Sequence, residues 1–184
     1  MKHKQSISKT FFAFLTSLIF IFAFTQNASA YSSRNPVHAT GTVYRVIDGD
    51  TYQINIDSNS YNQIKKAAGN QEKRLRHMID QYESIRVRLA NVNTDESVHS
   101  DKSKNTAIGK QISDEIKKLI EKKDVDLLCY DFGNHGRAVC SMTVHGNEGN
   151  FDMGAYLIQN GYSSYVRSWG DNPFYHEKYK SLSQ

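Results

Sequence analysis

Residues 43–56 read VYRVIDGDTYQINI, in which two short alternating segments flank Asp48-Gly49-Asp50. The alternation predicts two antiparallel strands, Val43–Ile47 and Tyr52–Ile56. Two interpretations of the turn stay open: a plain hairpin turn, which Asp-Gly favours, and a turn whose carboxylates hold a metal ion. An EF-hand is excluded, because the twelfth position from Asp48 is Asn59, where that loop needs a bidentate Glu.

The chain after this hairpin supplies three more strands and several helices. Ile85–Leu89 alternates and predicts a third strand with Arg86 and Arg88 on one face. The other expected elements are a helix at Ala107–Ile120, strands at Val125–Tyr130 and Arg137–Val144, a helix at Phe151–Asn160 with Asn150 as N-cap, and a short helix from Pro173 onward. This order predicts an α+β fold, a five-stranded OB-type β-barrel with about three appended helices.

The first thirty residues are expected to be a secretory signal peptide. Lysines precede an apolar run from Phe11 to Phe24, and Ala28-Ser29-Ala30 is a small-x-small cleavage pattern. The run is short for a membrane span, and an uncleaved anchor is the alternative. The expected organisation is a leader at 1–30, a linker at 31–39 and one domain at 40–184. The protein would then be secreted, extracellular and monomeric, with no stable membrane insertion after cleavage.

The charge of the chain changes when the leader is removed. The leader takes three of the 23 basic residues and none of the 19 acidic ones, which leaves 20 against 19. The remaining chain is nearly neutral by count. Attraction for nucleic acid must therefore come from a local basic patch and not from global charge.

Cys129 and Cys140 are the only cysteines, and they flank a predicted turn at Phe132–Gly136. Residues at equal distances from a hairpin turn face each other across two strands, so the spacing allows a disulfide in an oxidising compartment. Two small buried thiols are the alternative. Neither cysteine has the partners expected of a catalytic or zinc-binding residue.

Four motifs together resemble the staphylococcal nuclease (thermonuclease-like) family. They are Ile47–Thr51, the run Arg88-Leu89-x-x-Val92-Asn93-Thr94-x-Glu96, the pair Gly136-Arg137, and the helix pattern Met153-x-Ala155-x-Leu157-x-x-x-Gly161. The resemblance runs from about Thr40 to the C-terminus. The motifs are specific as a set and not singly.

The resemblance implies a calcium ion held by Asp50, Asn93 and the backbone carbonyl of Thr94, with Asp48 shaping the turn. The family has a second aspartate at the position of Asn93, whose amide oxygen coordinates calcium but brings no charge. Weaker calcium binding is therefore expected. Asp95 replaces the family's proline and adds a carboxylate nearby.

The resemblance also implies the catalytic groups. Glu96 would orient or deprotonate the attacking water, and Arg88 and Arg137 would hold the scissile phosphate. A hard cation with two guanidinium forks stabilises the charge that develops on the phosphate oxygens. Taken singly, the arginines are typical of solvated strand residues, and Thr94 and Glu96 are typical of turns.

Two further regions depart from the family or extend its pattern. The segment at about 57–83 is longer than is usual there and loosely helical, with an interruption at Gly69-Asn70. It is either a tolerated surface insertion or an excursion that covers the site or binds a partner. Arg167 and Trp169 lie where the family binds the nucleotide, and Trp169 would stack on a base or plug the core. His135 takes a position usually given to tyrosine.

The leading expectation is a secreted, calcium-dependent nuclease, a thermonuclease-like phosphodiesterase that cleaves DNA and RNA with little sequence specificity, preferring single strands. The alternative is a nuclease-like OB-fold module with an impaired metal site that binds nucleic acid or protein. A cell-surface structural role has no support beyond the leader. Asn93 separates the first two, because it decides how well the site holds calcium.

Overall fold

The computed structural model describes residues 31–184, and the predicted leader lies outside the described residues. Within them, no helix is both long enough and apolar enough to span a bilayer. The strands are β1 (Val37–Asp48), β2 (Thr51–Ile56), β3 (Met78–Ile79), β4 (Ser84–Leu89), β5 (Asp124–Phe132), β6 (Ala138–Gly146) and β7 (Gly149–Asp152). The α-helices are α2 (Ser58–Ala68), α3 (Glu72–Leu75), α4 (Ala107–Ile120), α5 (Met153–Gln159) and α6 (His176–Leu182).

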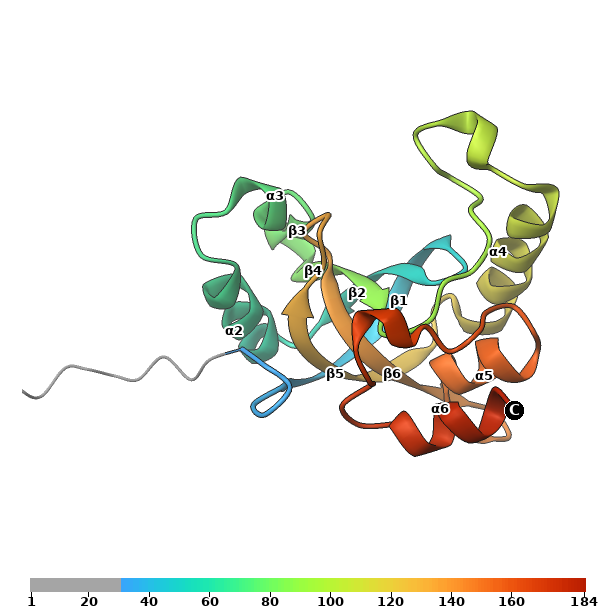
Figure 1. The fold of residues 1–184 in the computed structure, drawn as a ribbon. Helices are drawn as coiled ribbons and strands as arrows, with labels where there is room; N and C mark the ends of the chain where they lie inside the picture. Colours follow the sequence, from blue (N-terminus) through green and yellow to red (C-terminus); the bar gives the residue numbers. More distant parts are fainter. Residues whose placement is uncertain (1–30) are drawn as a thin grey trace, which may run out of the picture. The chain divides into compact units, whose positions relative to one another are not determined.

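Five strands close into a barrel in the order β4–β2–β1–β5–β6. Neighbours are antiparallel except at the closure, where β4 pairs parallel with β6 through Val87↔Ala138 and Leu89↔Cys140. β3 extends the β4 edge and β7 extends the β6 edge. The predicted α+β fold, a five-stranded OB-type barrel with helices around it, is confirmed (Figure 1).

The core forms where alternate strand residues point into the barrel. Tyr52 and Ile54 on β2, and Ile85 and Val87 on β4, are all fully or almost fully buried. α4 packs against β1 and buries Ile112, Ile116 and Ile120, which recur at helical spacing. Each fully buried aliphatic side chain stabilises the fold by about 1.5–3 kcal/mol.

The predicted start of the helix at Phe151 is wrong. Phe151 lies in β7, where it pairs with Val144 of β6, and α5 begins at Met153. The N-cap is Asp152 and not Asn150, since the Asp152 side chain accepts a hydrogen bond from the Ala155 backbone at 2.6 Å. Asp and Asn are equally good N-caps, so only the extra strand pairing decides between the two positions.

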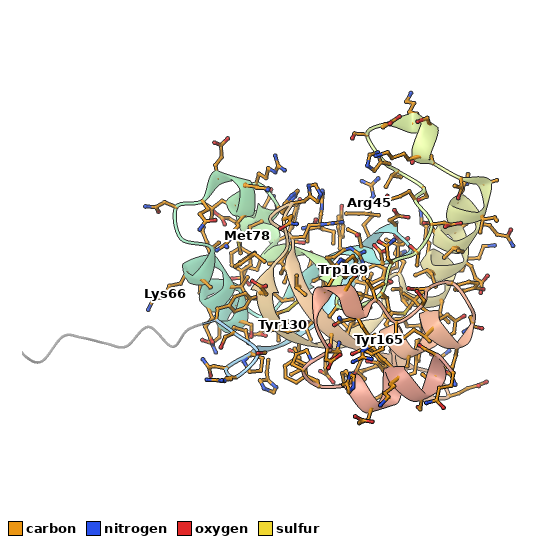
Figure 2. The ribbon with its side chains drawn as sticks, viewed as in Figure 1. Arg45, Lys66, Met78, Tyr130, Tyr165 and Trp169 are labelled. Carbon is orange, nitrogen blue, oxygen red and sulfur yellow. A yellow bond between two sulfur atoms is a disulfide. The ribbon has the colours of Figure 1, made fainter. Side chains whose placement is uncertain are left out.

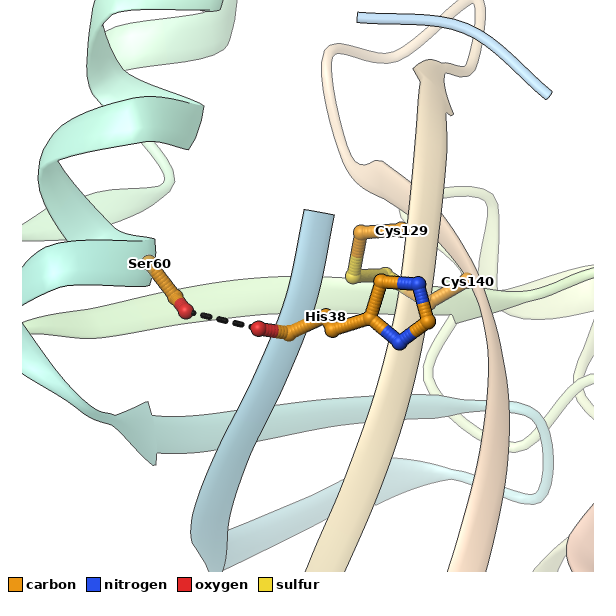
Figure 3. Close-up of a disulfide and its surroundings, with 4 residues drawn as sticks. All are labelled: His38, Ser60, Cys129 and Cys140. Carbon is orange, nitrogen blue, oxygen red and sulfur yellow. Dashed lines mark hydrogen bonds between the residues drawn. A yellow bond between two sulfur atoms is a disulfide. The ribbon is translucent and has the colours of Figure 1, made fainter. Parts of the chain in front are cut away.

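The inserted segment, residues 57–83, is packed onto the barrel. Asp57 caps the start of α2 by accepting from Ser60 N at 2.9 Å, and Gly69, which has a positive φ of 59°, is the C-cap after Ala68. α2 buries Tyr61 and Ile64 in the core. Ser60 Oγ donates to the His38 carbonyl of β1 at 2.9 Å (Figure 3). β3 was not expected from the sequence, because a two-residue strand carries no period.

Cys129 and Cys140 occupy paired positions on β5 and β6 and form a disulfide (Figure 3). Both are fully buried. Because the bond joins two strands that are already adjacent in the barrel, it closes a short loop of 11 residues in sequence separation.

We expect the double variant Cys129→Ala/Cys140→Ala to lose about 3 kcal/mol of unfolding free energy, since a short cross-linked loop restricts the unfolded chain by about that amount. Urea unfolding of the oxidised protein and the variant measures the loss. Reductant should lower the stability of the wild type and leave the variant unchanged. Coincident unfolding curves for all four samples would show that the bond adds no stability.

Candidate active site

A pocket of about 510 Å3 gathers polar side chains that are far apart in the sequence. Its walls come from the β1–β2 turn, the end of β4 with the loop after it, the β5–β6 turn, and Trp169. Figure 2 labels Trp169 and Tyr130, two of its lining residues. Six of the predicted site residues line this pocket: Asp50, Arg88, Asn93, Glu96, Arg137 and Trp169.

Asp50 is buried at the β1–β2 turn, and protein donors engage both of its oxygens. Oδ1 accepts from Thr51 Oγ1 at 2.9 Å, and Oδ2 accepts from the Thr94 backbone N at 2.9 Å and from Thr94 Oγ1 at 3.3 Å. Gly49 permits this approach, because a Cβ there would lie 2.6 Å from Thr94 Oγ1. Thr94 therefore positions Asp50 through its N–H and hydroxyl.

Arg88 joins Asp50 to the loop that follows β4. Its Nη1 lies 3.0 Å from Asp50 Oδ2 and donates to the Val92 carbonyl at 2.8 Å, while Nη2 donates to Asn93 Oδ1 at 2.8 Å. The side chains of Arg88 and Asp50 are only 10% and 7% exposed. This ion pair is therefore buried, and its loss would leave a charge without compensation.

Asn93 is exposed, but its backbone is fixed. Its N–H donates to Ser163 Oγ at 2.7 Å, which ties the loop after β4 to the segment after α5. Its Oδ1 is the acceptor for Arg88. An aspartate at this position would bring a second negative charge to the same guanidinium.

Asp48 and Glu96 form a pair of carboxyl groups beside Asp50. Burial, followed by the nearby charge of Asp48 and a hydrogen bond with it, raises the pKa of Glu96 above its ordinary value, and Asp50 adds to the effect. Asp48 is held by Ser97 Oγ at 2.7 Å and Ser113 Oγ at 2.9 Å. A raised pKa makes the Glu96 carboxylate a stronger base than an ordinary glutamate.

Arg137 lies in the β5–β6 turn, directly before β6, and its side chain reaches Thr51 beside Asp50. Its Nη1 donates to Thr51 Oγ1 at 3.0 Å. Its Nε is buried and has no hydrogen-bond partner among the described residues. Burial and the neighbouring Arg88 lower its pKa, while Asp50 and Glu96 act in the opposite direction. A buried guanidinium donor without an acceptor is costly, and an anion in the pocket would supply the acceptor.

The two residues predicted for nucleotide binding differ in their placement. Trp169 lines the pocket, is 57% exposed and lies over Arg88, with 5.4 Å from the guanidinium carbon to the ring centroid. It is therefore not a core plug. Arg167 is paired with Asp171 at 2.9 Å and is not among the pocket-lining residues. His135 lines the pocket beside Arg137.

Sequence reasoning missed part of the pocket wall. Tyr130 and Phe132 line it from the end of β5, and their i, i+2 spacing around the exposed Asp131 is a signal that could have found them. The serines that hold Asp48 carry no such signal, because they lie 49 and 65 residues away in the sequence.

The donor atoms around the pocket fit a hard cation in their chemistry. Asp48, Asp50 and Glu96 offer carboxylate oxygens and Asn93 an amide oxygen, which are calcium ligand types. Burial is the largest cause of the raised pKa of Glu96, and the nearby charges of Asp48 and Asp50 add to it. In residues 31–184, however, no group of three or more His, Cys, Asp or Glu is arranged as a metal site. Arg88 instead contacts both Asp50 and Asn93, so a cation would share these ligands with a guanidinium.

The sequence that forms most of this pocket matches a known protein family. The family model described as "Staphylococcal nuclease homologue" matches residues 86–184, which is more than half of the chain. The match begins in β4 and includes Arg88, Asn93, Glu96 and Arg137, but it stops short of Asp50 on the β1–β2 turn. No curated protein matches the chain.

Proposed function

The chain belongs to the staphylococcal nuclease family, and on that basis we propose that it is a secreted, calcium-dependent nuclease that hydrolyses DNA and RNA with little sequence preference. The observation that carries this proposal is the orphaned Nε of Arg137, which lies in the same pocket as Arg88, Asp50 and Glu96. A phosphodiester supplies the acceptor oxygen that this donor lacks.

The chain's own groups account for the chemical steps. A water oxygen attacks phosphorus while Glu96 takes a proton from that water. The bond from phosphorus to the leaving oxygen breaks, and the leaving oxygen takes a proton from solvent. Arg137 and Arg88 donate to the phosphate oxygens as negative charge grows on them, and guanidinium forks match that geometry better than ammonium groups do. The raised pKa of Glu96 suits it to the role of base.

Asp50, Asn93 and the Thr94 carbonyl would hold the calcium ion. When bound, calcium supplies positive charge beside the phosphate oxygens. Asp50 is already oriented by Thr94 and Thr51, so its carboxylate need not be ordered by the ion. Arg88 already contacts Asp50 and Asn93, so calcium must compete with a guanidinium for these two ligands, and weak calcium binding is expected. If calcium fails to displace Arg88 from them, the binding-module alternative is favoured.

Substrate breadth and location rest on separate features. Trp169 presents an exposed ring at the pocket, and base stacking on an aromatic ring tolerates every base and favours unpaired strands. The leader pattern at residues 1–30 and the disulfide both suit an oxidising, extracellular compartment. We propose that the protein acts there as a monomer.

The test is cleavage of single-stranded DNA and RNA at graded calcium by the wild type and by Asn93→Asp. We expect cleavage by the wild type at millimolar calcium, none in chelator, and a calcium requirement roughly tenfold lower in Asn93→Asp, because ligand charge strengthens calcium binding. Calorimetric titration of calcium into both proteins should show the same order of affinity.

Asn134→Asp is the matched control, since it adds the same charge to an exposed residue of the pocket wall outside the proposed ligand set. It should leave the calcium requirement close to that of the wild type. A wild type that binds DNA but cleaves nothing at millimolar calcium, with activity appearing in Asn93→Asp, would contradict the nuclease proposal and support the binding module.

A further inference from the structure

One face of β2 and β4 carries a polar row that leads away from the pocket. Thr51 pairs with Arg88 at the pocket, and Gln53 pairs with Arg86 two residues farther along both strands. Alternate strand residues share a face, so Arg86 lies on the same face as Arg88. Arg86 Nε donates to Gln53 Oε1 at 3.3 Å, which holds the guanidinium along this face.

β1 adds a second arginine to this row. Gln53 pairs with Arg45 as well, because a register shift between Val43 and Arg45 leaves Tyr44 as an extra residue. The bulge makes both Tyr44 and Arg45 exposed, where strict alternation would turn one of them inward. In the view of Figure 2, Arg45 is seen between the inserted segment and the loop before α4.

The inserted segment adds a third arginine and connects the row to Arg137. Arg86 N donates to the His77 carbonyl at 3.1 Å, and Arg76 precedes His77 with its Nε 3.4 Å from the His77 ring. His77 Nε2 lies 2.9 Å from the His135 carbonyl. Gly136, with φ 77°, packs so closely on α3 that a Cβ would lie 2.2 Å from the Lys73 carbonyl. The segment is therefore fixed against the turn that carries Arg137.

The charges of Arg45 and Arg76 both act on Arg86. Among residues 31–184, none of Arg45, Arg76 and Arg86 forms a salt bridge. Burial, together with the like charges of Arg45 and Arg76, lowers the pKa of Arg86. Like charges held together in this way form a site of positive potential that a polyanion would relieve.

An exposed aromatic pair stands beside the arginines. Tyr44 of β1 and Tyr82 of the inserted segment have nearly parallel rings, with 6.4 Å between centroids and 19° between planes. They are 59% and 53% exposed. Each ring therefore keeps an open face, and open aromatic faces next to cationic groups are the combination that binds single-stranded nucleic acid.

We propose that Arg45, Arg76, Arg86, Tyr44 and Tyr82 form a second binding surface, here called the basic strip, for the part of a nucleic-acid strand that extends beyond the scissile phosphate. The arginines bind the phosphates and the tyrosines stack on bases. The inserted segment supplies Arg76 and Tyr82, so it enlarges the substrate surface. This inference rests on the proposed function for the identity of the ligand as a nucleic acid.

The first test measures binding of a fluorescent 16-nucleotide single strand in chelator, where no turnover is needed. The triple variant Arg45→Gln/Arg76→Gln/Arg86→Gln should bind at least tenfold more weakly at low salt. Its plot of log affinity against log salt should flatten by about 2, because each phosphate contact on a single strand contributes about 0.7 to the slope. Lys66→Gln/Lys118→Gln/Lys180→Gln removes the same charge from exposed positions elsewhere and should keep the wild-type slope. An unchanged slope in the arginine variant overturns the proposal.

The second test separates stacking from charge. Tyr44→Ala/Tyr82→Ala should weaken binding of the 16-nucleotide strand by roughly tenfold and should not weaken binding of an abasic strand of the same length. Equal losses on both strands would contradict a stacking role. Both binding assays are done in chelator, so their outcome does not depend on cleavage. A wild type that cleaves nothing at millimolar calcium but binds the strand through the basic strip would refute the proposed nuclease and leave this inference standing.

Discussion

Glu96→Gln is expected to lower the rate of phosphodiester cleavage by between about 100-fold and 10,000-fold, the range for loss of a general base. Glutamine keeps the size and polarity of the side chain but cannot accept the water proton. The measurement is kcat on a single-stranded DNA substrate at saturating calcium, with binding of the uncleaved strand measured in chelator. Binding should stay near the wild-type value, because within residues 31–184 Glu96 forms no ion pair with the arginines that hold the phosphate.

The pH profile gives this prediction a second readout. Glu96 is active when deprotonated, so activity falls as pH decreases through its pKa, which burial and Asp48 hold above the usual value. In Asp48→Asn one repelling charge is gone, the pKa of Glu96 drops, and the acid limb of the profile should move to lower pH. Asp95→Asn changes an exposed carboxyl group next to Glu96 and is the control. A Glu96→Gln protein with wild-type kcat would remove Glu96 from the mechanism.

The element order could be predicted from the sequence because most strands show a clear period. β2 and β4 alternate between apolar and polar residues, and α4 buries Ile112, Ile116 and Ile120 at helical spacing. β3 and β7 were not predicted, because strands of two and four residues are too short to show a period. Their strand character comes from pairing with β4 and β6 and not from their own residues.

The site could be predicted as a set of residues but not as a network of bonds. The motifs around Arg88, Glu96 and Arg137 indicated residues that the pocket does bring together. Nothing in the sequence indicated that Arg88 would bond to Asp50 and Asn93 at once, because that contact depends on how the loop after β4 folds back. The position of Arg45 depends on a single bulge residue, Tyr44, and a one-residue shift reverses the face of every residue that follows.

Arg88→Gln is expected to reduce both activity and stability, and Arg88→Lys mainly activity. In Arg88→Gln the buried Asp50 carboxylate loses its cation, which costs about 3–5 kcal/mol of unfolding free energy. In Arg88→Lys the ammonium still pairs with Asp50, but one nitrogen cannot also reach the Val92 carbonyl and Asn93 Oδ1 in the fork geometry. We therefore expect near wild-type stability and a loss of about 100-fold or more in kcat, as for removal of a transition-state donor.

Two further variants distinguish the buried ion pair from the catalytic role. Asp50→Asn/Arg88→Gln removes both charges and should recover most of the stability lost in Arg88→Gln, without recovering activity. Arg137→Lys alters the other guanidinium, which forms no salt bridge within residues 31–184, so it should lose activity at almost unchanged stability. Urea unfolding and kcat on single-stranded DNA measure the two effects separately. If Arg88→Lys cleaves DNA as fast as the wild type, Arg88 serves only to neutralise Asp50, and Arg137 alone holds the phosphate.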